Sequence, residues 1–434
     1  MDGPTVALIC MLALLVILAA RVPIGIALAV VSIGGIIALR GTRPAFGMLG
    51  ALPFDFAASW SLSAVPMFLL MGALVYHTGL TRSLYAAARL WFNPLPGGLA
   101  VASNFASAGF AAASGSSLAT AAAMGRLAIP EMLSFGYNKG LATGTIAASG
   151  TLGAFIPPSI AFVLYGWYTQ QPIGTLLMAG IVPGVLTAFA YTAMIIIRCS
   201  RNPALAPKAE IVGGTREKFA ALRDIWPLPL LIVCIIGSIF SGIATATEAG
   251  AVGSACALLI ALFAGRLTRS NFMQSVLEAI ETTASIFFIA IGAILLTRFL
   301  AMAGVPRLMS DLVESWQLGT VEVILVMIVV YLILGMFLDP IGIMLLTLPV
   351  FLPMFDALEI NLIWIGVLVV KMIEVGLLTP PVGMNAFVVK NVVGSAVSLN
   401  QIFAGLLWFL VCEVVVIALL VALPGLSLWL PGLM

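Results

Sequence analysis

The stretch GMFLDPIGIMLLTLPVFLPM, from Gly335 to Met354, holds one charged residue, Asp339, in an otherwise apolar run. Three prolines are expected to interrupt the helix that such a run would otherwise form, because proline lacks a backbone donor and clashes with the preceding turn. An ionisable residue inside an apolar segment of this kind is costly to bury, so it indicates a functional site by default. The plainer alternative is a carboxylate that only caps the helix beginning at Pro340.

The composition of the whole chain is that of a membrane protein, since 62% of its 434 residues are hydrophobic and 8% are charged. Apolar runs of about 20 residues recur, which gives roughly ten candidate spans. The first of them ends before Arg21 and lacks a basic leader, so we expect it to be retained. A net charge of +2 without a basic, aromatic-rich cluster excludes nucleic-acid binding. The five cysteines show no paired spacing and predict neither a metal site nor a disulfide.

The longest polar stretch runs from Arg198 to Asp224 and contains six Lys or Arg residues. Short loops on the cytoplasmic side of a membrane are enriched in these residues. We therefore predict that residues 199–224 form a basic cytoplasmic loop, and that the N-terminus lies on the opposite side of the membrane.

The halves on either side of this loop share a register of Gly and Pro, at an offset of 223 residues (376 − 153). Four pairs follow it: Gly153 with Gly376, Pro157 with Pro380, Pro130 with Pro353, and Ser116 with Asp339. Identity elsewhere is low, so a chance coincidence is the alternative. An odd number of predicted spans separates the halves, which predicts inverted repeats. Inverted repeats with interrupted helices are typical of secondary transporters.

Each half contains two predicted interruptions, a helical hairpin too long for one span and a helix broken at a Pro-Pro pair. Broken backbone survives in a membrane only where protein or a polar cavity satisfies it, and its free carbonyls and nearby hydroxyls suit a small cation. We therefore predict two pseudo-symmetric cation sites. The candidate cation-binding residues are Ser114, Ser116, Ser117, Ser149, Gly150, Gly335, Asp339, Gly376 and Thr379.

The ordered motifs of the chain resemble those of a known family, the large membrane (M) subunit of tripartite ATP-independent periplasmic (TRAP) transporters. These motifs are SGSSLATAAAMGRLAIPEM, GYNKGLATGTIAASGTLGAFIPPSIAFVLYG, AGIVPG, FSGIATATEAGAVG, GMFLDPIGIM and GLLTPPVGMNAFVV. Two positions depart from the family pattern. Ala246 replaces a proline in the TATEA segment, and Lys371 stands where a neutral residue is usual.

The resemblance implies an all-α polytopic membrane protein, an inverted-repeat elevator transporter of the ion transporter superfamily with two re-entrant hairpins and two broken helices. It implies sodium-coupled import of a C4-dicarboxylate or sialic acid across the bacterial inner membrane, with sodium as coupling ion and no organic cofactor. The implied partners are a small (Q) subunit of about four spans and a periplasmic binding protein. The expected segments are scaffold 1–57, repeat 58–198 (hairpin 97–133, broken helix 138–170), loop 199–224, scaffold 225–265, repeat 266–400 (hairpin 318–356, broken helix 361–395) and C-terminal span 401–434.

The solute is expected beside the broken helices, at Pro157, Ser159, Lys371, Pro380, Asn385 and Arg298. For two of these the alternatives are plainer. Lys371 and Glu374 are three residues apart and are expected to neutralise each other, and Arg298 is expected to reach the membrane interface. The only histidine, His77, is expected to end a helix. Glu413, in a late apolar segment, has no predicted partner.

Two other functions fit parts of the sequence. One is a sodium/anion symporter that needs no binding protein. The other is an intramembrane protease, either with Ser114 and His77 or with an aspartyl pair. The serine version lacks a supporting oxyanion-hole signal, and Asp339 lacks a second intramembrane aspartate.

Overall fold

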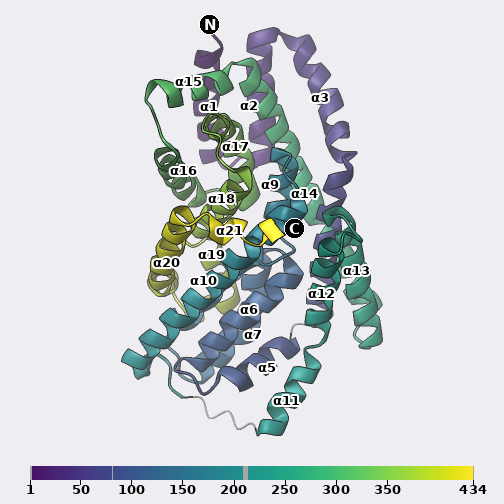
Figure 1. Ribbon diagram of the computed structural model, residues 1–434, viewed down its shortest axis with the longest axis vertical. Coiled ribbons are helices and arrows are strands. Elements are labelled where there is room, and N and C mark those ends of the chain that lie inside the picture. The colour runs from purple at the N-terminus through teal and green to yellow at the C-terminus, as the bar shows by residue number, and fades with distance from the viewer. Residues whose placement is uncertain (1, 81, 209–213, 434) are drawn as a thin grey trace.

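The structure is a computed structural model that describes residues 2–80, 82–208 and 214–433. Within these ranges the regular structure is entirely helical. The helices fill an elongated body with the N-terminus near one end and the C-terminus close to its middle (Figure 1). The all-α fold predicted from the sequence is confirmed.

Six described helices are long and apolar enough to cross a membrane, or seven if the bent pair α11 (Thr215–Asp224) and α12 (Pro227–Phe240) is one span. This number is smaller than the roughly ten expected by length. The reason is that apolar helices such as α1 (Gly3–Ala19), α2 (Ile24–Arg40) and α16 (Thr320–Gly335) have only 10–17 residues. The apolar segments are present, but breaks and turns shorten them.

The first repeat contains a hairpin of α6 (Gly98–Ser114) and α7 (Ser117–Ser134). Gly115 makes its tight turn with a φ of 60°, which glycine adopts at little cost. The broken helix follows as α8 (Lys139–Gly150), a short 3₁₀ turn at Thr151–Ala154 and α9 (Ile160–Thr169). Asn138 and Ser159 cap the two helical halves, so each half begins at its own cap.

The second repeat has the same order of elements. Its hairpin consists of α16 and α17 (Pro340–Ala357), and its broken helix of α18 (Leu362–Gly376) and α19 (Met384–Val393). The Pro157-Pro158 bond and the Pro380-Pro381 bond, one in each break, are both cis. The two hairpins and two broken helices of the predicted fold class are therefore present.

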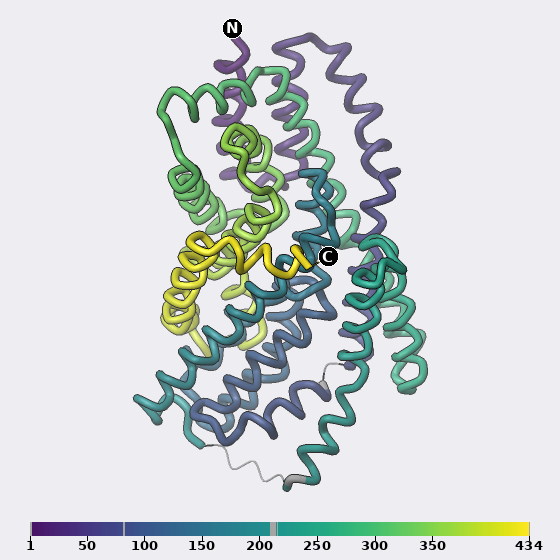
Figure 2. Tube along the Cα trace, viewed as in Figure 1, coloured from purple at the N-terminus to yellow at the C-terminus, as the bar shows by residue number. Residues whose placement is uncertain are grey.

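The two broken helices exchange their second halves between the repeats. α8 packs against α7 and α19, while α18 packs against α17 and α9. The apolar core follows the same division, since α6, α7, α8 and α19 share one buried cluster while α9, α17 and α18 share another. Figure 2 shows the yellow-green segment that holds α19 beside the blue first hairpin. Equivalent elements thus occupy equivalent places in both halves.

The remaining helices surround this centre. α14 (Arg269–Met302) is the longest and packs along α2 and α4 (Ala64–His77), while α13 (Ala246–Phe263) packs on α4 and α12. The other bounds are α3 Thr42–Ala57, α5 Arg82–Phe92, α10 Ile173–Arg201, α15 Val305–Ser315, α20 Leu399–Ala422 and α21 Gly425–Leu428.

The basic stretch 199–224, predicted to be a cytoplasmic loop, includes helical residues in the structure. α10 continues to Arg201, and α11 is helical from Thr215. Residues 209–213 of the predicted loop lie outside the described ranges.

Candidate functional site

The tip of the first hairpin lies directly on the first helix break. A methyl group on Gly153 would be 2.7 Å from the carbonyl oxygen of Ser116 and 2.9 Å from the nitrogen of Ser117. On the other side of the break, a methyl group on Gly115 would be 2.7 Å from the Pro158 carbonyl oxygen. Backbones approach this closely only where glycine leaves out the side chain. The break therefore meets the hairpin through main-chain atoms.

The predicted hydroxyls at this tip have different partners. The Ser114 hydroxyl lies 2.9 Å from that of Thr120, and the Ser116 hydroxyl accepts from the Ala119 amide as the cap of α7. The buried Ser117 hydroxyl has no hydrogen-bond partner among the described residues. Ser117 and Gly150 also meet, since a methyl group on Gly150 would lie 3.1 Å from the Ser117 carbonyl oxygen. These residues form one group around the first break.

Ser149 is directed differently from its neighbour Gly150. Its hydroxyl donates to Oδ1 of Asn104 at 2.7 Å, and Asn104 Nδ2 donates to the carbonyl oxygen of Ala188 at 2.8 Å. All of these polar atoms are buried. Asn104 was not among the predicted site residues, although an amide inside the apolar hairpin segment was a visible signal. It joins α6 to α8 and α10.

The second hairpin meets the second break through a pair of glycines, four residues before Asp339. A methyl group on either Gly335 or Gly376 would lie 2.7 Å from the α-carbon of the other. Asp339 is half-buried and caps α17, because its Oδ2 accepts from the Gly342 amide at 2.9 Å. The Thr379 hydroxyl donates to the Val375 carbonyl oxygen at 2.7 Å. Capping accounts for one carboxylate oxygen of Asp339.

The residues predicted to hold the solute are divided between the breaks and other places. Pro157 and Ser159 are buried in the first break, and Ser159 caps α9. Pro380 is half-buried in the second. Asn385 donates to the Ala147 carbonyl oxygen at 3.0 Å, which joins α19 to α8, and its own Oδ1 has no partner among the described residues. Arg298 is exposed on α14, and no described hydrogen bond joins it to either break.

Lys371 is the centre of a buried charged cluster that the sequence analysis paired incorrectly. Its Nζ lies 2.6 Å from Oε2 of Glu413 on α20 and 2.8 Å from the Thr187 hydroxyl on α10. Both charged side chains are fully buried, and Tyr191 donates to the other Glu413 oxygen. Glu374, the expected partner, is 2% exposed and has an oxygen without a hydrogen-bond partner among the described residues.

The partner of Lys371 comes from another helix. Residues three apart share one face of a helix, but α20 brings Glu413 against Lys371 from outside that helix. The pair joins α18 to α20, and Thr187 adds α10. The Lys371 ammonium also lies 5.0 Å from the centre of the Phe155 ring in the first break. Its charge is thus matched inside the protein and is not open to solvent.

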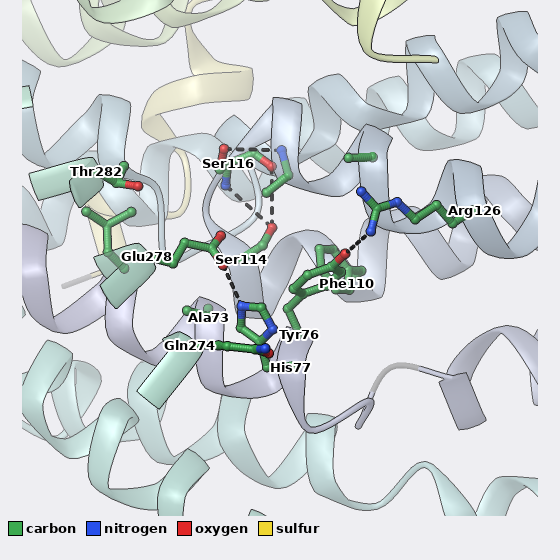
Figure 3. Close-up of a pocket in the computed structure, with 14 residues that line it drawn as sticks. Ala73, Tyr76, His77, Phe110, Ser114, Ser116, Arg126, Gln274, Glu278 and Thr282 are labelled. Carbon is green, nitrogen blue, oxygen red and sulfur yellow. Dashed lines mark hydrogen bonds and ion pairs between the residues drawn. The ribbon is translucent and has the colours of Figure 1, made fainter. Parts of the chain in front are cut away.

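A cavity of about 590 Å³ opens beside the first hairpin tip, between that tip, α4 and α14 (Figure 3). His77 ends α4, as predicted, and its Nε2 lies 2.6 Å from Oε2 of Glu278. Arg126 donates to the Tyr76 hydroxyl at 3.0 Å. Ser114 lines the same cavity, yet no hydrogen bond among the described residues joins it to His77. The serine arrangement that the protease alternative would require is therefore not formed among the described residues.

Comparison with known proteins gives a consistent result. The family model described as "Tripartite ATP-independent periplasmic transporter, DctM component" matches residues 11–426. The chain is 37% identical over 383 residues to the C4-dicarboxylate TRAP transporter large permease protein DctM of Pseudomonas aeruginosa, covering 87% of this chain and 88% of that protein. It is 32% identical to the sialic acid TRAP transporter large permease protein SiaM of Vibrio cholerae, covering 96% of each chain.

A solved structure has a similar fold at much lower identity. The YdaH transporter of Alcanivorax borkumensis aligns with a TM-score of 0.62 at 13% identity, covering 88% of this chain and 89% of that chain. At this identity the likeness concerns the arrangement of helices alone.

Proposed function

The chain belongs to the DctM-component family of TRAP transporters and is a large permease subunit, not an enzyme, and from this premise we propose that it imports a small organic acid together with sodium ions. The proposed solute is a C4-dicarboxylate or a sialic acid, as in the names of the two relatives. The protein is a multi-pass membrane protein, and the proposed location is the bacterial inner membrane.

The observation that carries this proposal is the seating of each hairpin on a broken helix. Gly153 approaches the first hairpin tip and Gly376 approaches the end of the first helix of the second hairpin, both through backbone atoms. Each half thus has a place where a helix break lies against a hairpin and backbone atoms of the two come close together. Broken helices of this kind supply oxygen ligands for cations and helix N-termini for anions.

In the proposed mechanism sodium binds first at both breaks. Ser114, Ser116, Ser117 and Gly150 surround the first, together with the nearby Ser149, while Gly335, Asp339, Gly376 and Thr379 surround the second. The ions offset the Asp339 charge and fix the hairpin tips, after which the anion is held beside Pro157, Ser159, Pro380 and Asn385. Sodium and solute must each tighten the binding of the other by the same factor. Lys371 does not contact the solute in this scheme, because its side chain is fully buried. Its role is to hold α18 against α20 through the ion pair with Glu413.

The proposed movement is of the elevator type. The hairpins and broken helices form the moving unit, and α1, α2, α12 and α13 belong to the static part with a small membrane subunit. A periplasmic binding protein delivers the solute. The buried connections among α8, α19 and α20 support a unit that moves as one body.

The test is uptake into proteoliposomes that contain this chain, its small membrane subunit and its binding protein. Labelled succinate and N-acetylneuraminate are offered under an inward sodium gradient, and a choline gradient of equal strength is the control. We expect uptake of one solute that requires both sodium and the binding protein. Sodium-driven uptake without the binding protein would favour the symporter that needs no binding protein. Equal uptake under the sodium and choline gradients would refute the proposed coupling to sodium.

A further inference from the structure

Two hollows adjoin at the end of α10, away from the helix breaks. One is a groove of about 610 Å³ between α10 and α20, lined by apolar side chains such as Met194, Ile197 and Val411. The other is a hollow of about 510 Å³ where α8 and α20 begin. Arg198 and Leu205 line both, so the apolar groove continues into the polar hollow. Figure 1 shows α20 and the C-terminal part of α10 at the left of the view, where the two helices pack together.

The polar end of this double hollow is basic. Arg198 and Arg201 line the groove, and Lys139 lines the second hollow. Among the described residues that line either space there is no Asp or Glu. The site is therefore complementary to an anionic group that carries an apolar chain.

Arg198 supplies an observation that points to a ligand. Its guanidinium carbon lies 4.6 Å from the centre of the Trp408 ring, and both residues line the groove. One terminal nitrogen, Nη1, is buried and has no hydrogen-bond partner among the described residues. A buried donor left unpaired is costly, and more so when charged. Phosphate is a preferred partner, because it matches the fork of guanidinium donors.

We propose that this double hollow binds one phospholipid with an anionic headgroup. An acyl chain lies in the groove between α10 and α20, and the phosphate is held by Arg198 and Arg201 at the end of α10. Basic pockets between membrane helices on the cytoplasmic side bind anionic headgroups in this way, and Trp408 has the residue type typical of the membrane interface. A partner helix would cover the groove but would leave the adjoining polar hollow without a matching group.

The occupied site has a mechanical effect. The lipid would contact both α10 and α20, the helices whose contact Tyr191 and Glu413 hold from the inside. The bound lipid therefore adds an outer connection to the same helix pair.

Native mass spectrometry of the full chain in detergent tests the proposal, with phosphatidylglycerol as probe and phosphatidylcholine of the same acyl chains as control. We expect phosphatidylglycerol to remain bound more strongly. Arg198→Gln and Arg201→Gln should each weaken its binding about fivefold, as expected for one basic residue near an anionic headgroup. Arg223→Gln, on the exposed surface of α11 outside both hollows, is the matched control and should bind like the original protein.

A second variant tests the apolar half of the site. Ala193→Trp places a large ring in the groove and should reduce the binding of both lipids, whatever the headgroup. Equal retention of the two lipids by the original protein would overturn the proposal, as would Arg198→Gln and Arg201→Gln variants that match Arg223→Gln. Loss of the bound lipid when the small membrane subunit assembles would show that a protein covers the groove, and would overturn it too.

Discussion

Removing the Lys371 charge should destabilise the protein much more than removing a surface charge. In Lys371→Met the flexible apolar side chain has a similar length, but the Glu413 carboxylate, 0% exposed, loses the ammonium now 2.6 Å away. The Tyr191 hydroxyl still donates to Glu413, so one oxygen stays satisfied. The other is left charged and buried.

The magnitude follows from this geometry. Removing one partner of a fully buried ion pair lowers the free energy of unfolding by about 3–5 kcal/mol, because the other charge is left buried and uncompensated. A loss of about 3 kcal/mol changes the folding equilibrium constant by about two orders of magnitude. Replacing both partners removes the unpaired charge, so the double variant Lys371→Met with Glu413→Gln should recover most of the loss. The two substitutions are therefore expected to couple by about 2 kcal/mol or more.

The assay is reversible unfolding in mixed micelles, titrated with a denaturing detergent and followed by helical circular dichroism. Arg89→Met is the matched control. It removes a cation whose 2.7 Å pair with Glu131 is partly exposed, with side chains 40% and 19% accessible. Its expected loss is below about 1 kcal/mol. A loss below about 1 kcal/mol for Lys371→Met, the range of ordinary polar contacts between membrane helices, would refute the reasoning.

Three further outcomes are expected. Gly376→Ala should lose about 1–3 kcal/mol of stability and most uptake, because the added methyl group would lie 2.7 Å from the α-carbon of Gly335. Gly237→Ala is the control and should keep both, since the nearest atom to its added methyl group is 4.0 Å away. Equal thermal stability of the two variants would contradict this prediction. Asp339→Asn should keep the helix cap, since asparagine caps well, yet weaken the sodium dependence of uptake; an unaltered sodium response removes Asp339 from the proposed site. Arg298→Gln, on the exposed face of α14, should leave the KM for the solute unchanged, and a rise in KM would place it at the solute after all.

The helix breaks were predictable from the sequence because proline and glycine act locally. A Pro-Pro pair cannot continue a helix, and a glycine before it tolerates close backbone contact. Both features are readable in a single segment, so a break could be expected at each Pro-Pro pair. The single prolines Pro349 and Pro353, which were expected to interrupt the helix, lie inside α17 without ending it. The capping role of Asp339 was also readable, from its place before Pro340.

The partners of the buried polar groups were not predictable in the same way. Lys371 has an acidic neighbour on its own helix, but its ion pair forms with Glu413, which the fold brings from α20. Ser149 lies beside the break in the sequence, yet its hydroxyl turns to Asn104 on α6. Spacing along one helix predicts a shared face, whereas these contacts depend on which helices the tertiary fold places next to each other.

The exchange of half-helices between the repeats has a consequence for biosynthesis. The core around α7 and α8 is complete only when α19 has arrived, and α19 is among the last helices to be made. Non-local contacts of this kind form slowly, and unfinished apolar surfaces favour misassembly. The surfaces of α7 and α8 that pack against α19 therefore stay uncovered in the nascent chain until almost the entire polypeptide has been inserted.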